Sequence, residues 1–181
     1  MRDKFDPIIF ECFTQEQVKE INKNIKKNII TKEDSLKASD HATKKGDFFL
    51  IPCSPLIELL HPWLYQCQQI NRNLFGYDIY WDFHLESFNY NVYGTKGDKY
   101  DWHIDARGFG VSDIKLTCLL NLSEESYEGG QFSDIASKKE FPNFVSGNGL
   151  VVVSMIAHKV TPIIKGKRIT LTYWAIGPQW R

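Results

Sequence analysis

The sequence predicts a mainly β protein, either a sandwich or a jelly-roll barrel, with N-terminal helices packed on one sheet (an α+β arrangement). Three observations lead to this fold class. After Gly76 the chain consists of short β-prone runs separated by glycine-bearing turns, as in all-β sandwiches and barrels. Before Gly76, apolar residues recur at helical spacing instead. The run 150–153 is continuously apolar, which fits a strand buried on both faces and thus a sheet covered by helices.

The helical pattern before Gly76 has start and stop signals. Thr14 and Gln17 fit a capping box, in which each side chain satisfies a free backbone N–H of the first turn. The first helix should then bury an apolar stripe at Val18, Ile21, Ile25 and Ile29. The Ser-Pro pair at 54–55 suits the start of a second helix. Pro62 is expected to end that helix and begin a third, and Gly76 to end the third as a left-handed C-cap.

Strand signals occur on both sides of residue 76. Before it, 8–10 and 47–52 are β-prone, and the polar segment 31–47 is expected to be a loop. After it, seven runs are expected to form strands, at 79–93, 100–105, 114–122, 131–134, 149–154, 159–164 and 168–176.

The expected domain organisation is simple. A chain of 181 residues can bury a sizeable core in one domain, and no internal repeat, low-complexity tract or linker divides it. We therefore expect a single domain over 1–181, with a helical support region at 1–76 and the β core at 77–181.

Composition excludes several classes of protein. Hydrophobic residues make up 43%, which indicates a globular chain, and the formal net charge of zero predicts neither a nucleic-acid partner nor an anionic membrane. The four cysteines form no Cys-x-x-Cys pair, so reduced core thiols are favoured over a disulfide framework or a zinc site. Neither a signal-peptide core nor an apolar run of ~18 residues is present, so a soluble, cytoplasmic protein is expected.

The pattern that carries chemistry starts in the segment 100–105. His103 and Asp105 are two residues apart, so in a strand their side chains lie on one face. An imidazole and a carboxylate side by side provide two ligands of a 2-His-1-carboxylate facial triad, which binds Fe(II). His158, between two expected strands, is the candidate for the third ligand. The other histidines have no carboxylate at ligand spacing: His41, His61 and His84.

Arg168 follows His158 by ten residues, with a Lys-Gly hairpin signal at 165–166. We therefore expect these two residues on neighbouring antiparallel strands, with Thr170 on the same face as Arg168. Fe(II) with three protein ligands has three open positions, so a chelating 2-oxo acid can fill two and leave one for O2. A dicarboxylate such as 2-oxoglutarate then needs a cation for its distal carboxylate, which Arg168 supplies with the Thr170 hydroxyl beside it. Further candidates around this cosubstrate are Tyr93, Tyr100 and Trp174.

Each of these features has a more ordinary interpretation when taken alone. A His-x-Asp pair is common in surface hydrogen bonds, a single histidine or aromatic residue in a strand usually belongs to the core, and an arginine in a late strand is usually solvated. The ordered combination of His-x-Asp, a Gly-Gly turn, a valine strand, His and Arg-x-Thr favours a metal and cosubstrate site.

Eight segments carry a family resemblance: 71–78 (NRNLFGYD), 93–94 (YG), 100–105 (YDWHID), 122–123 (LS), 127–130 (YEGG), 158–162 (HKVTP), 166–171 (GKRITL) and 177–181 (GPQWR). With them, the chain from residue 63 to residue 181 resembles the Fe(II)/2-oxoglutarate-dependent dioxygenases of the prolyl-4-hydroxylase-like superfamily, especially the PKHD-type hydroxylases. The fold that this resemblance implies is a double-stranded β-helix (jelly-roll or cupin-like) with helices supporting one sheet.

The resemblance also implies roles for single residues. It matches His103, Asp105 and His158 to the iron ligands. It matches Arg168 to the residue that holds the distal carboxylate of 2-oxoglutarate, and it gives supporting contacts to Thr170 and Tyr93. Two positions depart from the family pattern: Asn121 stands where some relatives place a tyrosine or threonine that helps to bind 2-oxoglutarate, and Lys159 where many carry arginine.

The activity implied is that of a dioxygenase that uses Fe(II), 2-oxoglutarate and O2, with ascorbate as an accessory cofactor that the family allows. It would hydroxylate a peptidyl (prolyl-type) or small-molecule substrate and release succinate and CO2. Asp105 favours hydroxylation, because related halogenases lack the carboxylate. The polar segments 31–47 and 106–113 are expected to border the substrate. Two alternatives remain open, a non-catalytic β-sandwich binding module and an iron oxidase that does not use 2-oxoglutarate.

Overall fold

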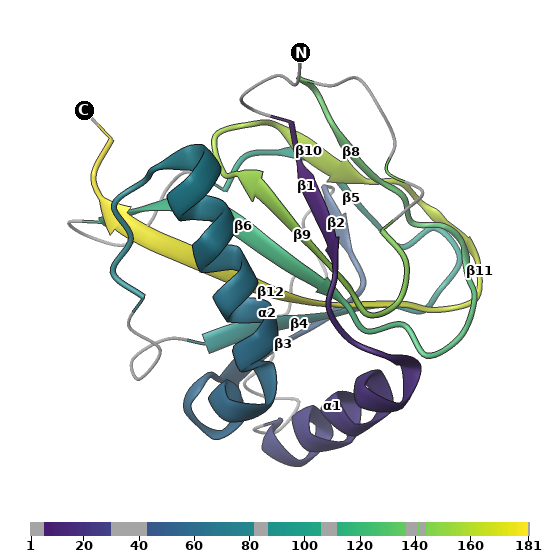
Figure 1. The fold of residues 1–181 in the computed structure, drawn as a ribbon. Coiled ribbons are helices and arrows are strands. Elements are labelled where there is room, and N and C mark those ends of the chain that lie inside the picture. The colour runs from purple at the N-terminus through teal and green to yellow at the C-terminus, as the bar shows by residue number, and fades with distance from the viewer. Residues whose placement is uncertain are drawn as a thin grey trace.

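The protein is a sandwich of antiparallel sheets with two long helices on one side (Figure 1), so the predicted fold class is confirmed. The computed structural model describes residues 6–29, 43–81, 87–105, 112–136, 141 and 144–180. The major sheet has the order β1 (Ile8–Glu11), β9 (Asn148–Val153), β6 (Ser112–Asn121), β12 (Arg168–Pro178), β4 (Ser87–Tyr93) and β3 (Asp47–Pro52). The minor sheet has the order β2 (Lys44–Lys45), β5 (Lys99–His103), β10 (His158–Val160) and β8 (Phe132–Asp134), and β11 (Ile163–Lys165) pairs with β7 (Glu128–Gly129).

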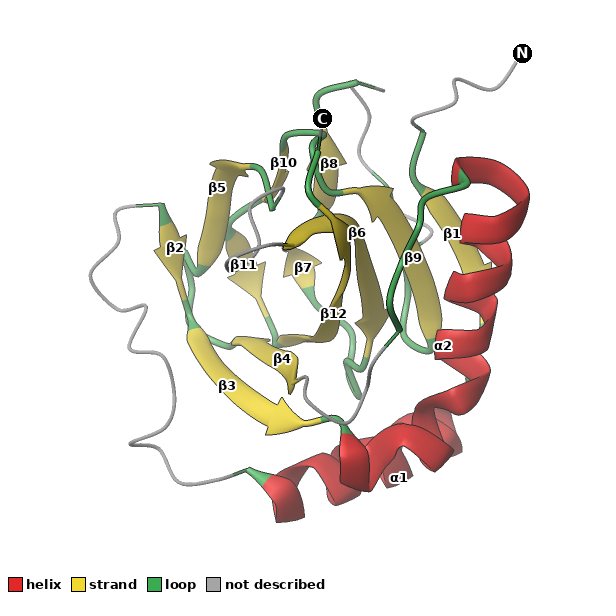
Figure 2. Cartoon of the chain, turned by 90° about the vertical axis from the view of Figure 1, so that its left-hand side faces the viewer, coloured by secondary structure: helices red, strands yellow, loops and turns green. Residues whose placement is uncertain are grey.

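The helices α1 (Gln15–Asn28) and α2 (Ile57–Ile70) cover the outer face of the major sheet, as Figure 2 shows. Alternation along the strands divides the sheet into two faces. On β4 and β12, one set of alternating side chains packs against the helices in the largest core cluster, and the other set points into the sandwich. The helix-facing set on these two strands is Phe88, Tyr90, Val92, Ile169, Leu171, Tyr173 and Ala175.

The first helix forms as its sequence predicts. The Thr14 N–H donates to Gln17 Oε1 at 2.9 Å and the Gln17 N–H donates to Thr14 Oγ1 at 3.4 Å, which completes the expected capping box. The buried residues of α1 include Val18, Ile21 and Ile25, three positions of the predicted apolar stripe. The stripe therefore both specifies the helix and attaches it to the sheet.

The prediction that Pro62 separates two helices is wrong. A 3-10 turn at Ser54–Leu56 leads directly into α2, which runs through Pro62 to Ile70. An interior proline costs about 3 kcal/mol because it removes a backbone hydrogen bond. Buried residues of α2 lie on both sides of the proline, so packing against the core stabilises a continuous helix through this position. These residues are Leu60, Trp63, Leu64 and Cys67. Gly76 ends the helical segment with φ of 70°, as predicted.

The expected strand at 159–164 is in fact two strands. β10 ends at Val160 and β11 begins at Ile163, with Thr161 and Pro162 between them. Proline lacks the N–H that a continuous ladder needs, so the chain changes partner there. β10 belongs to the minor sheet and β12 to the major sheet, and the expectation that His158 and Arg168 lie on neighbouring strands is therefore wrong.

Other boundaries also differ from expectation. β4 begins only at Ser87; residues 79–81 are not in a strand, and 82–86 lie outside the described residues. The two-residue strands β2 and β7 were not predicted. The first 76 residues contribute β1 and β3 to the major sheet and β2 to the minor sheet, so this region supplies strands as well as helical support.

Three of the four cysteines are buried, as the sequence predicts for core thiols. Within the described part of the chain, no helix is both long and apolar enough to cross a membrane.

Asn22 fixes α1 to the sheet through a buried polar network. Its Nδ2 donates to the Leu122 carbonyl at 2.8 Å and to Glu124 Oε1 at 2.9 Å, and its Oδ1 accepts from Tyr90 Oη at 3.1 Å. We expect Asn22→Ala to lower the free energy of unfolding by about 1–3 kcal/mol, because it leaves buried partners unsatisfied. Urea denaturation measures this loss.

The matched control for that substitution is Asn24→Ala on the same helix. Asn24 is half-buried, and its side chain donates to Glu20, one turn away. Its replacement should change stability by less than about 0.5 kcal/mol. Equal effects of the two substitutions would show that the network does not anchor the helix.

Candidate metal and cosubstrate site

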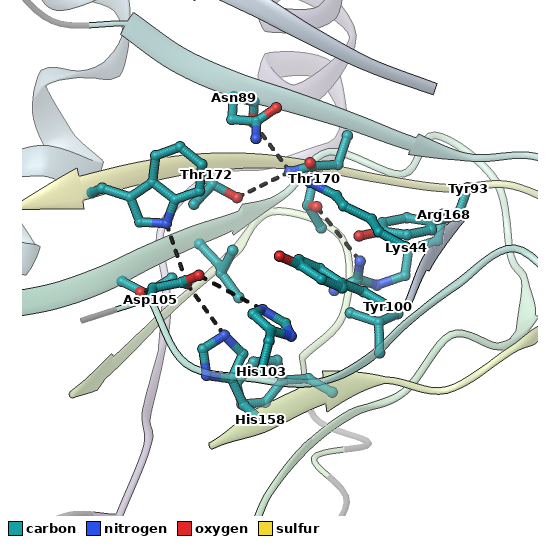
Figure 3. Close-up of a pocket in the computed structure, with 16 residues that line it drawn as sticks. Lys44, Asn89, Tyr93, Tyr100, His103, Asp105, His158, Arg168, Thr170 and Thr172 are labelled. Atoms are coloured by element: carbon teal, nitrogen blue, oxygen red, sulfur yellow. Dashed lines mark hydrogen bonds and ion pairs between the residues drawn. The ribbon is translucent and has the colours of Figure 1, made fainter. Parts of the chain in front are cut away.

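A cavity lies between the inner faces of the two sheets (Figure 3). Alternation with a period of two directs one residue in two of β4, β6 and β12 into it. The major sheet contributes Asn89, Asn91, Tyr93, Thr117, Leu119, Arg168, Thr170, Thr172 and Trp174. The other side contributes Lys44, Tyr100, His103, Asp105, Phe132, His158 and Val160. The cavity therefore has two walls, and each wall carries part of the predicted chemistry.

Two histidines and one carboxylate meet at one end of this cavity. The possible ligand atoms of His103, Asp105 and His158 all lie within 4.8 Å of one another. His103 and His158 are direct cross-strand partners of β5 and β10, so their ring centroids are 4.3 Å apart. Asp105 follows β5 by two residues, and its N–H donates to the Ser154 carbonyl at 3.0 Å, which holds its backbone against the turn after β9. Its carboxylate oxygens lie 3.7 Å from His103 Nε2 and 3.3 Å from His158 Nε2.

Hydrogen bonds around these three side chains orient them. His103 Nδ1 lies 2.7 Å from the Asp101 carbonyl and His158 Nδ1 lies 2.9 Å from the Ile156 carbonyl. A carbonyl can only accept, so each Nδ1 carries a proton, and in the neutral imidazole Nε2 is then the nitrogen that can bind a metal. The Asp105 carboxylate is held by two donors from the major sheet, Thr117 Oγ1 at 2.9 Å and Trp174 Nε1 at 3.2 Å.

The electrostatics favour the protonation states that bind a metal. Burial, followed by the charge of His158, lowers the pKa of His103 to about 4, so its imidazole is neutral at neutral pH. Burial alone would raise the pKa of Asp105. The hydrogen bond and charge of His158, the charge of His103 and the Thr117 hydroxyl outweigh that effect and lower it to about 2. Two imidazoles and one ionised carboxylate form a donor set suited to Fe(II).

The bond from Thr117 to Asp105 gives a test of this orientation. We expect Thr117→Val, which removes the hydroxyl and keeps the shape, to weaken Fe(II) binding about tenfold, as outer hydrogen-bond partners of metal ligands commonly do. Competition with a chelator measures the affinity. Thr172→Val is the control, because the Thr172 hydroxyl accepts from Asn91 and does not contact Asp105. Unchanged affinity in Thr117→Val would show that the hydroxyl does not position the carboxylate.

Arg168 stands in the major-sheet wall. Its side chain is 1% exposed, and its guanidinium carbon lies 5.3 Å from the centroid of the Tyr93 ring and 5.9 Å from that of Phe144. Nη1 lies 3.5 Å from Thr170 Oγ1, whereas Nε and Nη2 have no hydrogen-bond partner among the described residues. No described carboxylate forms an ion pair with it. A buried, unpaired guanidinium is costly, so this end of the cavity is built for an anionic ligand.

The structure places the two predicted tyrosines in the cavity wall. The Tyr93 ring packs edge-on against Phe48, with centroids 5.6 Å apart, beside Arg168. The Tyr100 ring stacks on His103 at a centroid distance of 3.4 Å. Burial raises the pKa of Tyr100 to about 12 and raises that of Tyr93 further, so both phenols remain donors at neutral pH.

Asn121 does not line the cavity. Its Nδ2 donates to the Phe144 carbonyl at 2.8 Å and to Tyr127 Oη at 3.1 Å, and its Oδ1 accepts from the Ser123 N–H at 3.0 Å. With these three bonds the Asn121 amide has a structural role. It does not line the cavity in which the cosubstrate is expected to bind.

Two features of the site were not predicted. The bonds of Thr117 and Trp174 to Asp105 depend on the approach of two sheets, which the sequence does not define. Lys44, which lines the cavity, was assigned to the loop 31–47 because its neighbours have no apolar period. The expected substrate-bordering segments fall largely on 30–42 and 106–111, outside the described residues.

Comparison with known proteins agrees with this geometry. Residues 88–176 match the model of the 2OG-Fe(II) oxygenase superfamily, a range that includes every cavity-lining residue except Lys44. About half of the chain is thus similar to a superfamily whose description names 2-oxoglutarate and Fe(II). Over 85 residues it is 31% identical to a PKHD-type hydroxylase from Hyphomonas neptunium, a match that covers 44% of this chain and 38% of that protein.

Solved structures show the same fold. A prolyl-4-hydroxylase from Pseudomonas putida superposes with a TM-score of 0.71 at 18% identity, covering 98% of this chain and 94% of that one. A viral collagen prolyl hydroxylase from Paramecium bursaria Chlorella virus 1 gives 0.69 at 14% identity, covering 94% and 96%. A prolyl hydroxylase from Trichoplax adhaerens, solved with a hypoxia inducible factor peptide, gives 0.68 at 17% identity, covering 93% and 82%. These three prolyl hydroxylases thus share the fold of this chain.

Proposed function

We propose that the protein is an Fe(II)- and 2-oxoglutarate-dependent hydroxylase that acts as a single domain. One observation carries the proposal: a cluster of two histidines and one carboxylate shares a cavity with a buried arginine that has no anionic partner among the described residues. A dicarboxylate that chelates a metal at one end needs a cation at its other end, and the cavity supplies both.

In this proposal His103, Asp105 and His158 hold the iron on one face through two Nε2 atoms and a carboxylate oxygen. Thr117 and Trp174 keep the carboxylate turned toward the imidazoles. The bound iron would supply the oxidative chemistry with O2, while the surrounding chain fixes geometry and excludes water.

The residues around Arg168 would bind 2-oxoglutarate, each through a different group. Arg168 would bind the distal carboxylate of 2-oxoglutarate through Nε and Nη2, the two nitrogen atoms that lack a partner. The hydroxyls of Thr170 and Tyr93 would donate to the same molecule, and Tyr100 would do so nearer the metal. Turnover would then release succinate and CO2, and ascorbate would be an accessory reductant.

The substrate is proposed to be a peptidyl prolyl-type residue or a small molecule. The names of the similar proteins support the first of these, because three solved neighbours are prolyl hydroxylases. No observation in the described residues favours a non-catalytic binding module over the enzyme.

Anaerobic titration tests the proposal. Protein loaded with Fe(II) should develop a weak visible charge-transfer band when 2-oxoglutarate chelates the metal. Intrinsic fluorescence of Trp174, which bonds to Asp105, provides a second readout. Absence of both signals in folded, iron-loaded protein would contradict the proposed function and favour a binding module.

A further inference from the structure

Lys44 is a second cation in the cavity. It lies on β2, the edge strand of the minor sheet, directly opposite Tyr100 of β5. Its side chain lines the cavity, as Figure 3 shows, while Lys45 beside it is exposed. Lys44 Nζ sits 3.8 Å from the centroid of the Phe48 ring and 4.7 Å from that of Tyr100. Among the described residues it has neither an ion-pair partner nor a hydrogen-bond acceptor.

Lys44 stands on the minor sheet, as His103 and His158 do, whereas Arg168 stands on the major sheet. The Tyr100 ring that it contacts is stacked on His103, so one aromatic ring joins the ammonium to a metal ligand. Its charge interacts with Asp105, which acts to raise its pKa, and contributes to the lowered pKa of His103. Arg168 instead packs against Tyr93. The two cations therefore stand on opposite walls of the cavity.

The positive charge of Lys44 is not accounted for by the metal and the cosubstrate. A divalent metal, Asp105, Arg168 and a dicarboxylate together have no net charge, so Lys44 adds one positive charge that the cosubstrate and metal do not require. Burial lowers its pKa to about 8, so the ammonium is still mostly charged at neutral pH while partly removed from water. The rings of Phe48 and Tyr100 stabilise it only in part. A cation held there with no anionic partner among the described residues indicates a ligand that brings an anion.

We propose that Lys44 binds a carboxylate at the metal end of the cavity, at a subsite separate from Arg168. The proposal rests on the proposed function, since it assumes that iron and 2-oxoglutarate occupy the site. Two molecules can bring this carboxylate: the 1-carboxylate of 2-oxoglutarate beside the metal, or an acidic group of the primary substrate. In the second case the enzyme would select acidic substrates, such as a free amino acid or an acidic peptide.

The experiment compares Lys44→Met with Lys45→Met, the exposed neighbour on the same strand. Iron-loaded protein is first titrated anaerobically with 2-oxoglutarate. The saturated complex is then titrated with propionate and, separately, with propionamide, which has the same size and no charge. The visible band and tryptophan fluorescence are both followed, so that binding is detected even without the band. Lys44→Arg, which keeps the charge, should retain the behaviour of the unmodified protein.

Each result has a defined meaning. If Lys44→Met alone raises the Kd for 2-oxoglutarate about tenfold or more, the subsite takes the 1-carboxylate of the cosubstrate; this fold-change is that expected for losing one charged hydrogen bond. If 2-oxoglutarate binds normally and only propionate binding is lost, the subsite takes a substrate carboxylate. If both affinities are unchanged, or propionamide binds as propionate does, the proposal is overturned. A failure of the proposed function can be told apart from a failure of this proposal, because in that case the unmodified protein shows no response to 2-oxoglutarate.

Discussion

Replacing Arg168 by methionine is expected to raise the Kd for 2-oxoglutarate by about 30-fold or more and to leave Fe(II) binding unchanged. Removing one partner of a buried, hydrogen-bonded charge pair costs about 2–5 kcal/mol. The metal ligands stand on other strands, so their geometry should be unaffected. The folded protein should not lose stability, because among the described residues the guanidinium has two unsatisfied nitrogen atoms and no ion pair to lose. Titration of the visible band measures the affinity.

Two variants sharpen this test. Arg168→Lys keeps a charge and loses the fork of parallel donors, so its affinity should fall between those of the methionine variant and the unmodified protein. Lys167→Met removes the exposed cation one residue earlier and should have no effect. A methionine variant that bound 2-oxoglutarate normally would show that the distal carboxylate lies elsewhere.

Replacing His158 by alanine is expected to weaken Fe(II) binding more than about 100-fold and to abolish turnover. Loss of an outer hydrogen-bond partner alone costs about 10–100-fold in metal affinity, and loss of a ligand should exceed that. His158 is 3% exposed and aligned with His103 by the pairing of β5 with β10, so no described histidine can take its place. Equilibrium binding against a chelator measures the loss, and the 2-oxoglutarate band should disappear with it.

His61→Ala is the matched control for that variant. His61 is an exposed residue of α2 that stacks on Tyr65, and it lies outside the cavity lining. Iron affinity should be unchanged in it. Iron binding in His158→Ala at the level of this control would contradict the assignment of the third ligand.

The parts of the site that depend on local periodicity could be predicted from the sequence. His103 and Asp105 needed only the two-residue repeat of a strand, and Arg168 and Thr170 the same repeat on a later strand. The capping box of α1 and the left-handed Gly76 are likewise local signals, and both are present.

The predictions that were wrong or missing depend mainly on which strands pair, and strand pairing joins residues that are far apart in the sequence. The segment 165–166 leads from β11 to β12, but these strands do not pair with each other, so the predicted hairpin does not form. Pro162 has already moved the chain out of the minor sheet. His158 and Arg168 therefore belong to opposite walls, which ten residues of sequence do not reveal. Lys44 was missed for a similar reason, because a two-residue strand has no detectable period and gains its place only by pairing with β5. Pro62 shows that packing can outweigh a strong local stop signal.

The division of the site between two sheets links ligand binding to the integrity of the sandwich. Two metal ligands stand on β5 and β10 of the minor sheet and Arg168 on β12 of the major sheet, so a molecule reaching from the metal to the guanidinium spans the interface between the layers. Its binding free energy then opposes their separation, by an amount that grows with the logarithm of its concentration above Kd. The cosubstrate would act as a reversible cross-link, and amide hydrogens of both sheets should exchange more slowly together when it is bound.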